Sequence, residues 1–250
     1  MIIKGDQTRA LTLSTFAFTV CFAIWTIFSI LGVKIKEDLS LSDTQFGLLV
    51  ATPILSGALS RLILGIWSDQ YGGRIVMTLT MLLSAISTYL LSSAKTYEMF
   101  LLAALGVGLA GGAFAVGVTY ISTWYEKEKQ GTALGIFGVG NVGAAITNFG
   151  APLIMVTYGW HGLAKTYAAI IFVTAIFFYL FAKDDPKLIA RKEKRERPTS
   201  ILQQLQPLKN LQVWRFSLYY FFVFGAFVAL ALWLPHYYVG VYNLDIKTAG

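Results

Sequence analysis

One arginine stands alone in apolar sequence. Arg61 lies within the stretch Phe46 to Trp67, which is long enough to cross a bilayer. It is the only charged side chain deep inside an apolar run of this chain, and all thirteen Asp and Glu residues lie in or beside loops. A guanidinium in hydrocarbon costs roughly 2.5–3.5 kcal/mol on insertion scales, so it needs a partner. Backbone, water, a carboxylate outside this sequence or a bound anion could be that partner, and we favour a bound anion.

The residues around Arg61 predict which way it faces. Gly57, Arg61 and Gly65 are spaced at i, i+4 and i+8, so they share one helix face. A face flanked by glycines packs against other helices rather than lipid. The alternative is a side chain that snorkels to the headgroups. Arg61 lies about 9 Å inside the helix end at Trp67, so snorkelling would require it to climb more than one turn.

Composition indicates the class of fold that must position this arginine. Hydrophobic residues make up 56% of the 250 residues and charged residues only 13%, which is typical of a polytopic membrane protein. Continuous apolar runs of about 20 residues indicate helices, because only helices and closed barrels cross lipid. We predict an all-α protein with seven transmembrane helices. They lie at about Leu11–Val33, Thr44–Trp67, Ile75–Ala94, Tyr97–Trp124, Gly131–Val156, Leu163–Ala182 and Val213–Tyr238.

The distribution of Lys and Arg predicts the orientation. With the N-terminus in the cytoplasm, fourteen of the twenty basic residues fall on the cytoplasmic side and five fall outside, with Arg61 in the membrane. This bias predicts a multi-pass protein of the cell inner (plasma) membrane with a cytoplasmic N-terminus. It also explains the net charge of +7 without nucleic acid, because the positive excess lies next to the apolar spans.

A charged segment divides the chain. Lys183 to about Gln212 follows the sixth span, and its core, Lys187–Pro198, predicts a short surface helix. We interpret it as a solvated linker that touches anionic headgroups, with a regulatory or partner site as the alternative. The predicted domains are a six-helix bundle at 1–182, a cytoplasmic linker at 183–212, and the first helix of an incomplete second bundle at 213–250. A transporter with two six-helix halves would need about five more spans, so the missing half of the same protein is an expected partner.

The loop between the second and third spans carries a recognisable pattern. GIWSDQYGGRIV contains Gly65, Asp69, Gly72, Gly73 and Arg74, which resemble the signature of the major facilitator superfamily. The glycines permit a tight reversal. Asp69 lies near the cytoplasmic helix end, and Arg74 can pair with carboxylates on moving neighbours. We predict a conformational latch here, with an ordinary polar turn as the alternative.

Glycines dominate the fifth span and part of the fourth. Gly138, Gly140 and Gly143 fit G-x-G-x-x-G, but the upstream segment is a membrane-length helix and no acidic residue follows until Asp184, so a dinucleotide site is excluded. Together with Gly135 they predict a face for close helix packing. Asn141 is a rare intramembrane amide, either a hydrogen-bonded contact between helices or a donor to an anion. The fourth span carries Gly108, Gly112 and Phe114, and we predict that its glycines approach those of the fifth. In the seventh span Tyr220 and Phe224 share a face, a spacing more often used for packing than for a site.

Four segments together resemble the nitrate/nitrite porters of the major facilitator superfamily. They are SGALSR, GGAFAVG, GTALGIFGVGNVGAAITNFGAP and YFFVFGAF, in the second, fourth, fifth and seventh spans. The resemblance implies a major facilitator-like bundle in which Arg61 contacts nitrate or nitrite, Phe114 and Phe224 flank the flat anion, and Tyr220 and Asn141 lie near it. The second substrate arginine and second glycine signature of that family belong to later helices.

The resemblance predicts alternating-access transport by proton symport or by nitrate/nitrite exchange, because inward movement of an anion opposes the membrane potential. The alternatives are a transporter of another small anion, such as a monocarboxylate, and a truncated chain or assembly partner that does not transport. We expect no enzyme, cofactor or metal, since Cys21 is the only cysteine and no nucleophile–base pair or cofactor motif occurs. His161 and His236 lie at predicted outer helix ends, where an interfacial structural role is expected.

Overall fold

The computed structural model describes residues 4–194 and 200–250, and within these residues the regular structure is entirely helical. The elements are α1 Lys4–Trp25, α2 Phe28–Asp38, α3 Asp43–Tyr71, α4 Gly73–Leu91, α5 Tyr97–Val107, α6 Leu109–Trp124, α7 Lys127–Gly138, the 3₁₀ helix η1 Val139–Val142, α8 Gly143–Phe181, α9 Pro186–Glu193, α10 Ile201–Gln204, the 3₁₀ helix η2 Gln206–Lys209, α11 Leu211–Tyr242 and α12 Ile246–Ala249. Ser42 and Gln45 begin α3 with the capping box that their spacing predicts.

Six helical stretches are long and apolar enough to cross a membrane, which confirms a multi-span helical protein. They are Gly5–Asp38, Asp43–Tyr71, Gly73–Leu91, Tyr97–Trp124, Lys127–Phe181 and Leu211–Tyr242. The fourth has the predicted bounds. The fifth covers both the fifth and the sixth predicted spans in 55 residues, because helical hydrogen bonding continues through the predicted loop. Gly159 interrupts the helical backbone there, with φ 68° and ψ 175°. The predicted count of seven therefore stays a prediction.

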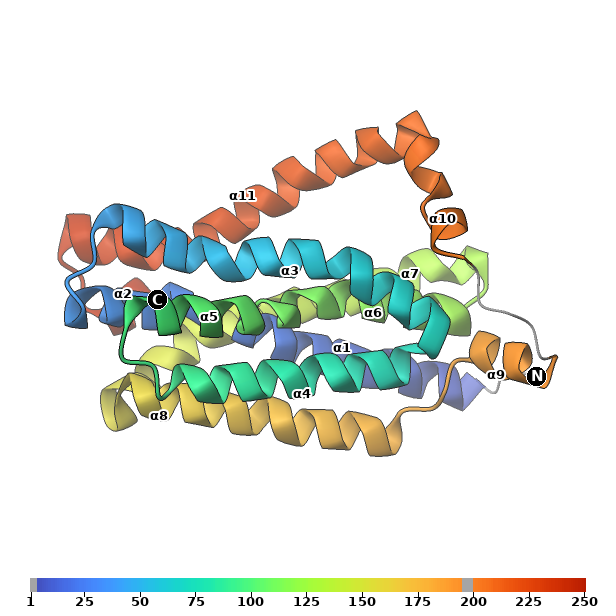
Figure 1. Ribbon diagram of the computed structural model, residues 1–250, viewed down its shortest axis with the longest axis horizontal. Coiled ribbons are helices and arrows are strands. Elements are labelled where there is room, and N and C mark those ends of the chain that lie inside the picture. The colour runs from blue at the N-terminus through green and yellow to red at the C-terminus, as the bar shows by residue number, and fades with distance from the viewer. Residues whose placement is uncertain (1–3, 195–199) are drawn as a thin grey trace.

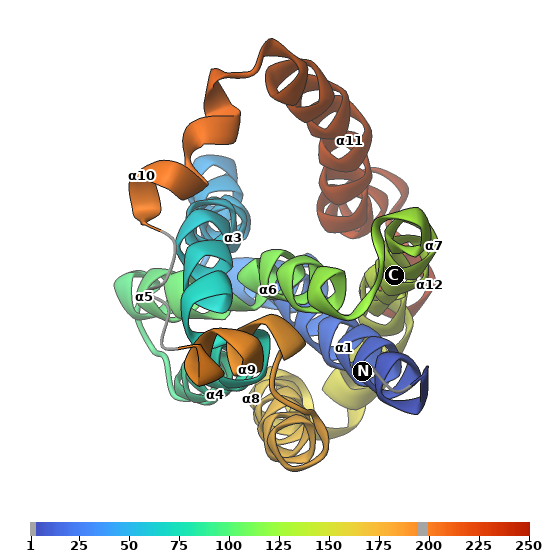
Figure 2. The same cartoon turned by 90° about the vertical axis from the view of Figure 1, so that its right-hand side faces the viewer.

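The long helices lie side by side along one axis (Figure 1). Viewed along that axis, α1 lies between α6 and α8, and α11 stands on the opposite side of the bundle from α4 and α8 (Figure 2). α11 leans away from α3 toward the end of the molecule where α10 lies. Most of its large apolar side chains are exposed, and only Val228, Leu232 and Pro235 are buried.

The core is an aromatic cluster centred on α1. Phe18, Phe22 and Trp25 are each at most 2% exposed. Phe18 stacks on Phe137 of α7 with ring centroids 4.7 Å apart, and Phe22 meets Trp25 edge to face. Large buried rings supply much of the apolar area that helix packing requires. They also anchor the end of α1, which a turn at Thr26 and Ile27 separates from α2.

The glycines of the fourth span meet several neighbours: Gly108, just before α6, and Gly112 pack against α3, whereas Gly117 packs against the ring of Phe137 in the predicted fifth span. Gly108 lies against Pro53 of α3, where an added Cβ would be 2.6 Å from the Pro53 carbonyl oxygen. Gly112 lies against Ser60 and Leu64 of the same helix. The small residues of α6 lie on more than one face, and sequence spacing does not tell which neighbour each face meets. The fifth-span glycines that are tightly packed, Gly140 and Gly143, contact α1.

Replacing Gly108 with alanine is expected to destabilise the protein by about 1–3 kcal/mol, the usual cost of overpacking a tight contact. The Ser56 hydroxyl is nearest and can rotate away, but the Pro53 carbonyl and Cα behind it are backbone of α3 and cannot. Thermal unfolding in detergent micelles measures the change. Gly131→Ala in α7 is the matched control, because a Cβ there meets no described atom within 4 Å. Equal unfolding temperatures for the two variants would contradict close α3–α6 packing at Gly108.

The charged segment after α8 begins with a docked helix. Leu188 and Arg191 of α9 are buried against the end of α3, so the first part of the predicted linker is packed and not simply solvated. Leu188 supplies an apolar anchor and Arg191 an ion-pair anchor. The predicted surface helix Lys187–Pro198 is helical to Glu193, and residues 195–199 lie outside the described part of the chain.

Candidate functional site

Arg61 is partly buried in the protein, as its glycine-flanked face predicts. Its Nε donates a hydrogen bond to the carbonyl of Gly111 in α6, at 3.1 Å. Gly57 lies against Trp25 and the carbonyl of Gly108, and Gly65 lies near Ala115 of α6. In the structure this face therefore lies against α1 and α6, the arrangement that the spacing predicts. The side chain crosses to a neighbouring helix, which favours an inward-facing arginine over one that snorkels.

Three aromatic rings surround the guanidinium. Its Cζ lies 5.4 Å from the ring centroid of Trp25, 5.6 Å from that of Phe114 and 5.4 Å from that of Phe224. The Tyr220 hydroxyl interacts electrostatically with the same guanidinium. The negative faces of aromatic rings attract a cation without neutralising it. In the described part of the chain no carboxylate lies within 4 Å of Arg61, so the positive charge stays available to an anion.

The arginine opens onto a cavity between α3 and α11. Its volume is about 600 Å³, and Arg61, Trp25, Tyr220 and Phe224 are among the residues that line it. Most of the wall is apolar, which strengthens an electrostatic contact by excluding water. A second cavity of about 500 Å³ also borders Arg61 and extends to Asp69 and Lys187.

The sequence-predicted anion residues are only partly brought together. Arg61, Phe114, Tyr220 and Phe224 form one cluster, and Phe114 stacks near Tyr220. Asn141 uses its Nδ2 to donate to the Gly138 carbonyl of its own segment at 2.8 Å, and its buried Oδ1 has no partner. Asn141 hydrogen-bonds within its own segment and Arg61 to α6, so the predicted role of Asn141 near an anion stays a prediction.

Only some of the glycines predicted for close packing in the fifth span are tightly packed. Gly140 would place a Cβ against the ring of Phe18, and Gly143 would place one against the backbone of Thr19. At Gly135 and Gly138 a Cβ would meet no described atom within 4 Å. Close packing is therefore found for the first pair, and for the second pair it stays a prediction.

Trp25 is the member of the cluster that sequence reasoning missed. Its Nε1 donates to the Pro53 carbonyl at 2.8 Å, and its ring is nearly parallel to that of Phe224, with 8° between the planes. Membrane tryptophans concentrate at the interfaces. Trp25 instead lies well inside the predicted span Leu11–Val33, a position that could have singled it out.

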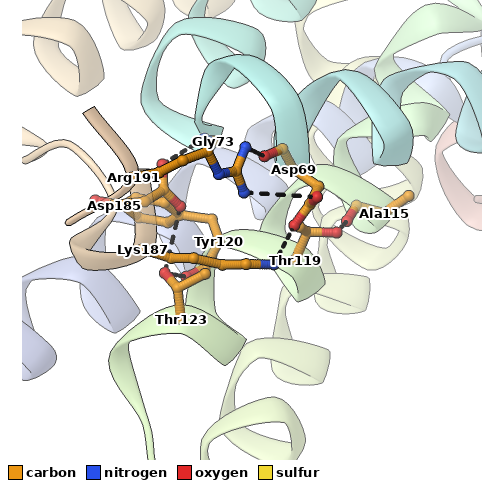
Figure 3. A network of polar contacts seen from close by, with 9 residues as sticks. All are labelled: Asp69, Gly73, Ala115, Thr119, Tyr120, Thr123, Asp185, Lys187 and Arg191. Carbon is orange, nitrogen blue, oxygen red and sulfur yellow. Dashed lines mark hydrogen bonds and ion pairs between the residues drawn. The ribbon is translucent and has the colours of Figure 1, made fainter. Parts of the chain in front are cut away.

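A second polar cluster joins the loop after α3 to α9 (Figure 3). Lys187 donates to the Asp69 carboxylate at 2.5 Å, and Arg191 Nη2 lies 3.8 Å from the same carboxylate. Arg191 Nη1 also donates to the Asp69 main-chain carbonyl at 2.9 Å. Gly72, with φ 94°, makes the predicted tight reversal. The loop motif is thus tied to the charged segment, and Lys187 and Arg191 were not predicted as its partners.

Arg74 and Asp185 tie the same loop to the end of α8. Arg74 donates through Nε and Nη2 to the Tyr179 carbonyl and lies 3.4 Å from Asp184. Asp185 is 3% exposed and accepts a 2.7 Å hydrogen bond from the Gly73 amide. The predicted pairing of Arg74 with a carboxylate is found. Asp185 was missed because its partner is a main-chain amide, which no side-chain pattern announces.

Burial raises the pKa of Asp185 to about 6, although the Gly73 amide and the Thr123 hydroxyl favour its charged form. An exposed aspartate has a pKa near 3.9, so the folded protein binds the proton more tightly than the unfolded chain. The neutral acid therefore contributes stability fully below about pH 4, and that contribution is lost as the pH rises through 6.

Asp185→Asn, which resembles the neutral acid, is expected to remove this pH dependence. Relative to the variant, the wild type should lose about 2 kcal/mol between pH 4.5 and 7.5. Thermal unfolding in micelles across this range measures the difference. Asp184→Asn, at a more exposed carboxylate that pairs with Arg74, is the control. Parallel pH profiles for wild type and Asp185→Asn would contradict the assignment.

The two histidines lie within long helices and not at their ends: His161 lies in α8, two residues after the interruption at Gly159, and His236 lies six residues before the end of α11. Nε2 of His236 lies 3.4 Å from Nζ of Lys36, and its ring lies 4.3 Å from that of Phe46. His161 stacks on Trp160 at 3.5 Å. These contacts are consistent with the structural role predicted for both.

A helical bundle with six stretches long and apolar enough to cross a membrane, and an arginine at a cavity between two of them, defines a multi-pass membrane protein. The sequence profile of the Major Facilitator Superfamily matches residues 13–250, and the chain belongs to that superfamily. The solved structure of a bacterial homolog to the human lysosomal transporter Spinster, inward-facing and unoccupied, has the same fold. Its TM-score is 0.78 at 18% identity, over 99% of this chain and 58% of that one.

Curated relatives match almost the whole chain. A probable nitrate/nitrite antiporter, NarK1 of Thermus thermophilus, is 43% identical over 98% of this chain and 57% of its own length. The probable nitrate transporter NarT of Staphylococcus epidermidis is 32% identical, over 96% and 60%. The nitrite extrusion protein of Bacillus subtilis is 31% identical, over 98% and 60%. The chain spans about three fifths of the length of these relatives.

Proposed function

We propose that this chain is part of a nitrate and nitrite transporter of the nitrate/nitrite porter branch of the superfamily. The observation that carries the proposal is Arg61, a membrane arginine with no carboxylate partner in the described residues, held among three rings at the wall of a cavity. The names of the relatives support the same substrates. Nitrate is planar and weakly hydrated, and a guanidinium offers two parallel N–H donors to two of its oxygens.

In this proposal Nε of Arg61 is engaged by Gly111, so the two terminal nitrogens form the fork that meets the anion. Tyr220 adds a hydroxyl, and Phe114 and Phe224 present rings whose positive edges tolerate an anion. We keep the proposal that Asn141 lies near the anion and that Gly135 and Gly138 belong to a face for close helix packing. Movement follows alternating access, with uptake coupled to protons or to exchange of nitrate against nitrite, because the membrane potential opposes anion entry.

The proposed topology has seven spans, because the interruption at Gly159 splits the 55-residue stretch into two helices of bilayer length. The N-terminus is cytoplasmic and the membrane is the cell inner membrane. Residues 1–182 then form the first bundle, 183–212 the linker, and 213–250 the first helix of a second bundle. The second bundle supplies the rest of the site. The length that the chain lacks relative to its relatives supports this division.

Uptake of nitrate and nitrite into proteoliposomes tests the function. The longer protein that contains this chain is compared with the 250-residue chain alone, with and without a proton gradient and with nitrite inside the vesicles. Uptake by the longer protein alone supports a two-bundle transporter, and the gradient separates symport from exchange. Stronger competition by formate or lactate than by nitrite would favour the monocarboxylate alternative. No anion flux in any arm would overturn the transport proposal and favour a non-transporting assembly partner.

A further inference from the structure

Trp25 is held in place by a hydrogen bond as well as by packing. It is 2% exposed, is the last residue of α1, and precedes the break at Thr26 and Ile27. Its Nε1 donates to the Pro53 carbonyl of α3 at 2.8 Å. This hydrogen bond fixes the rotation of the indole as well as its position, so the ring has one orientation against its neighbours.

Two glycines on different helices make room for the indole. An added Cβ at Gly57 of α3 would be 2.8 Å from Nε1 of Trp25, and one at Gly111 of α6 would be 2.6 Å from the same atom. Such distances lie far inside van der Waals contact, which for carbon pairs is about 3.5–4.0 Å. The ring therefore fills a slot between α3 and α6 that any larger residue would close.

The same slot positions the arginine. Gly111 admits the indole by lacking a Cβ, and its carbonyl accepts the hydrogen bond from Nε of Arg61. Cζ of Arg61 lies 5.4 Å from the Trp25 centroid and 5.4 Å from the Phe224 centroid, and these two rings are nearly parallel, with centroids 6.5 Å apart. One end of the guanidinium group is thus bonded to backbone, and the group lies beside two parallel rings at equal distances.

We propose that Trp25 is a positioning residue that fixes the plane of the Arg61 guanidinium and thereby sets the preference of the site for flat anions over pyramidal ones. This inference rests on the proposed function. A guanidinium held in one plane can donate to two oxygens of nitrate or nitrite in that plane. Because the side chain is already ordered, binding of the anion loses less conformational entropy. Chlorate also offers two oxygens, but its third oxygen projects out of the plane that those two share with chlorine. A guanidinium free to tilt would accommodate both shapes.

The test compares nitrate uptake, and its inhibition by chlorate, in the longer protein and its Trp25→Phe variant. Phenylalanine keeps a ring but loses the Pro53 hydrogen bond and part of the ring face. The expected result is a KM for nitrate raised about tenfold, a kcat within about twofold, and a nitrate-over-chlorate preference lowered about tenfold. Trp214→Phe is the matched control, because exposed Trp214 also donates Nε1 to a main-chain carbonyl, that of Leu208 at 2.8 Å.

A second substitution covers the case in which Trp25→Phe fails to fold. A tetrafluorinated tryptophan placed at position 25 keeps the shape and the Nε1–H but weakens the negative face that attracts the guanidinium. It should raise the KM for nitrate and lower the nitrate preference in the same direction. A purely structural role would leave the anion preference unchanged.

The outcomes separate the two proposals. If the wild type transports nitrate and both substitutions leave the nitrate-to-chlorate ratio unchanged, the positioning role is wrong and the function stands. If the wild type transports neither nitrate nor nitrite, the function is wrong and the inference falls with it. A lowered ratio in both substitutions, with Trp214→Phe behaving as wild type, supports both.

Discussion

Arg61→Lys is expected to lower nitrate and nitrite transport by at least about 100-fold. Lysine keeps the charge but presents a single ammonium, so it loses the planar two-donor fork. It also loses the Nε hydrogen bond to Gly111 and the flat contact with the surrounding rings. A hydrogen bond to a charged group contributes about 1.5–3 kcal/mol, so loss of the fork alone accounts for an effect of this size.

Initial rates in proteoliposomes, normalised to the amount of folded protein, measure this effect. Arg215→Lys is the matched control, since Arg215 also lies in a helix, α11, and makes an exposed hydrogen bond of 3.5 Å to the Tyr219 hydroxyl. It should transport like the wild type. Wild-type KM and rate in Arg61→Lys would show that the arginine is structural, and the substrate proposal would then rest on relatives alone.

The parts of this site that the sequence predicts are those set within one helix. The spacing of Gly57, Arg61 and Gly65 defines a face whatever surrounds it, and that face does pack inward. The capping box at Ser42 and Gln45 is local in the same sense. Helical periodicity determines such features, so they can be read before any tertiary contact is known.

The parts of the site that the sequence did not predict depend on which helices become neighbours. Trp25 meets Arg61 only because α1, α3 and α6 converge, and residues 25 and 61 carry no spacing relation that would announce it. Likewise the tight contact of Gly108 is with α3, although its helix has small residues on several faces. Main-chain partners, such as the Gly111 carbonyl and the Gly73 amide, cannot be predicted from residue type, because every residue carries these groups.

The loop motif combines a local feature that the sequence predicts with distant partners that it does not predict. Its glycines predict the reversal that Gly72 makes, and Asp69 lies at the helix end as expected. Its partners come from α9, more than 100 residues later, in a segment whose charge pattern favoured a solvated linker. The second cavity borders Arg61, Asp69 and Lys187 together. The ion pairs at the loop therefore lie at the end of the space that begins at the proposed anion site.

Asp69→Asn is expected to lower the maximum rate of nitrate exchange about tenfold or more while leaving the KM within about twofold. The anion-binding groups are untouched, so binding should persist. Asp69 and Arg191 side chains are only 16% and 10% exposed, and removing the carboxylate leaves the arginine charge buried without its ion-pair partner. The connection between α3 and α9 then loosens, and the conformational step that depends on it is impaired.

A double-mutant cycle with Arg191→Gln decides whether the pair acts as a unit. If Asp69 and Arg191 work through each other, the second substitution should add little to the first, with a coupling energy of about 1 kcal/mol or more in the rate. Glu193→Gln, an exposed change on the same helix, should leave the rate unaltered. Strictly additive losses, or a raised KM in Asp69→Asn with an unchanged maximum rate, would contradict a latch. Because Arg61 is not altered in any of these proteins, a change confined to the maximum rate can be assigned to movement and not to recognition of the anion.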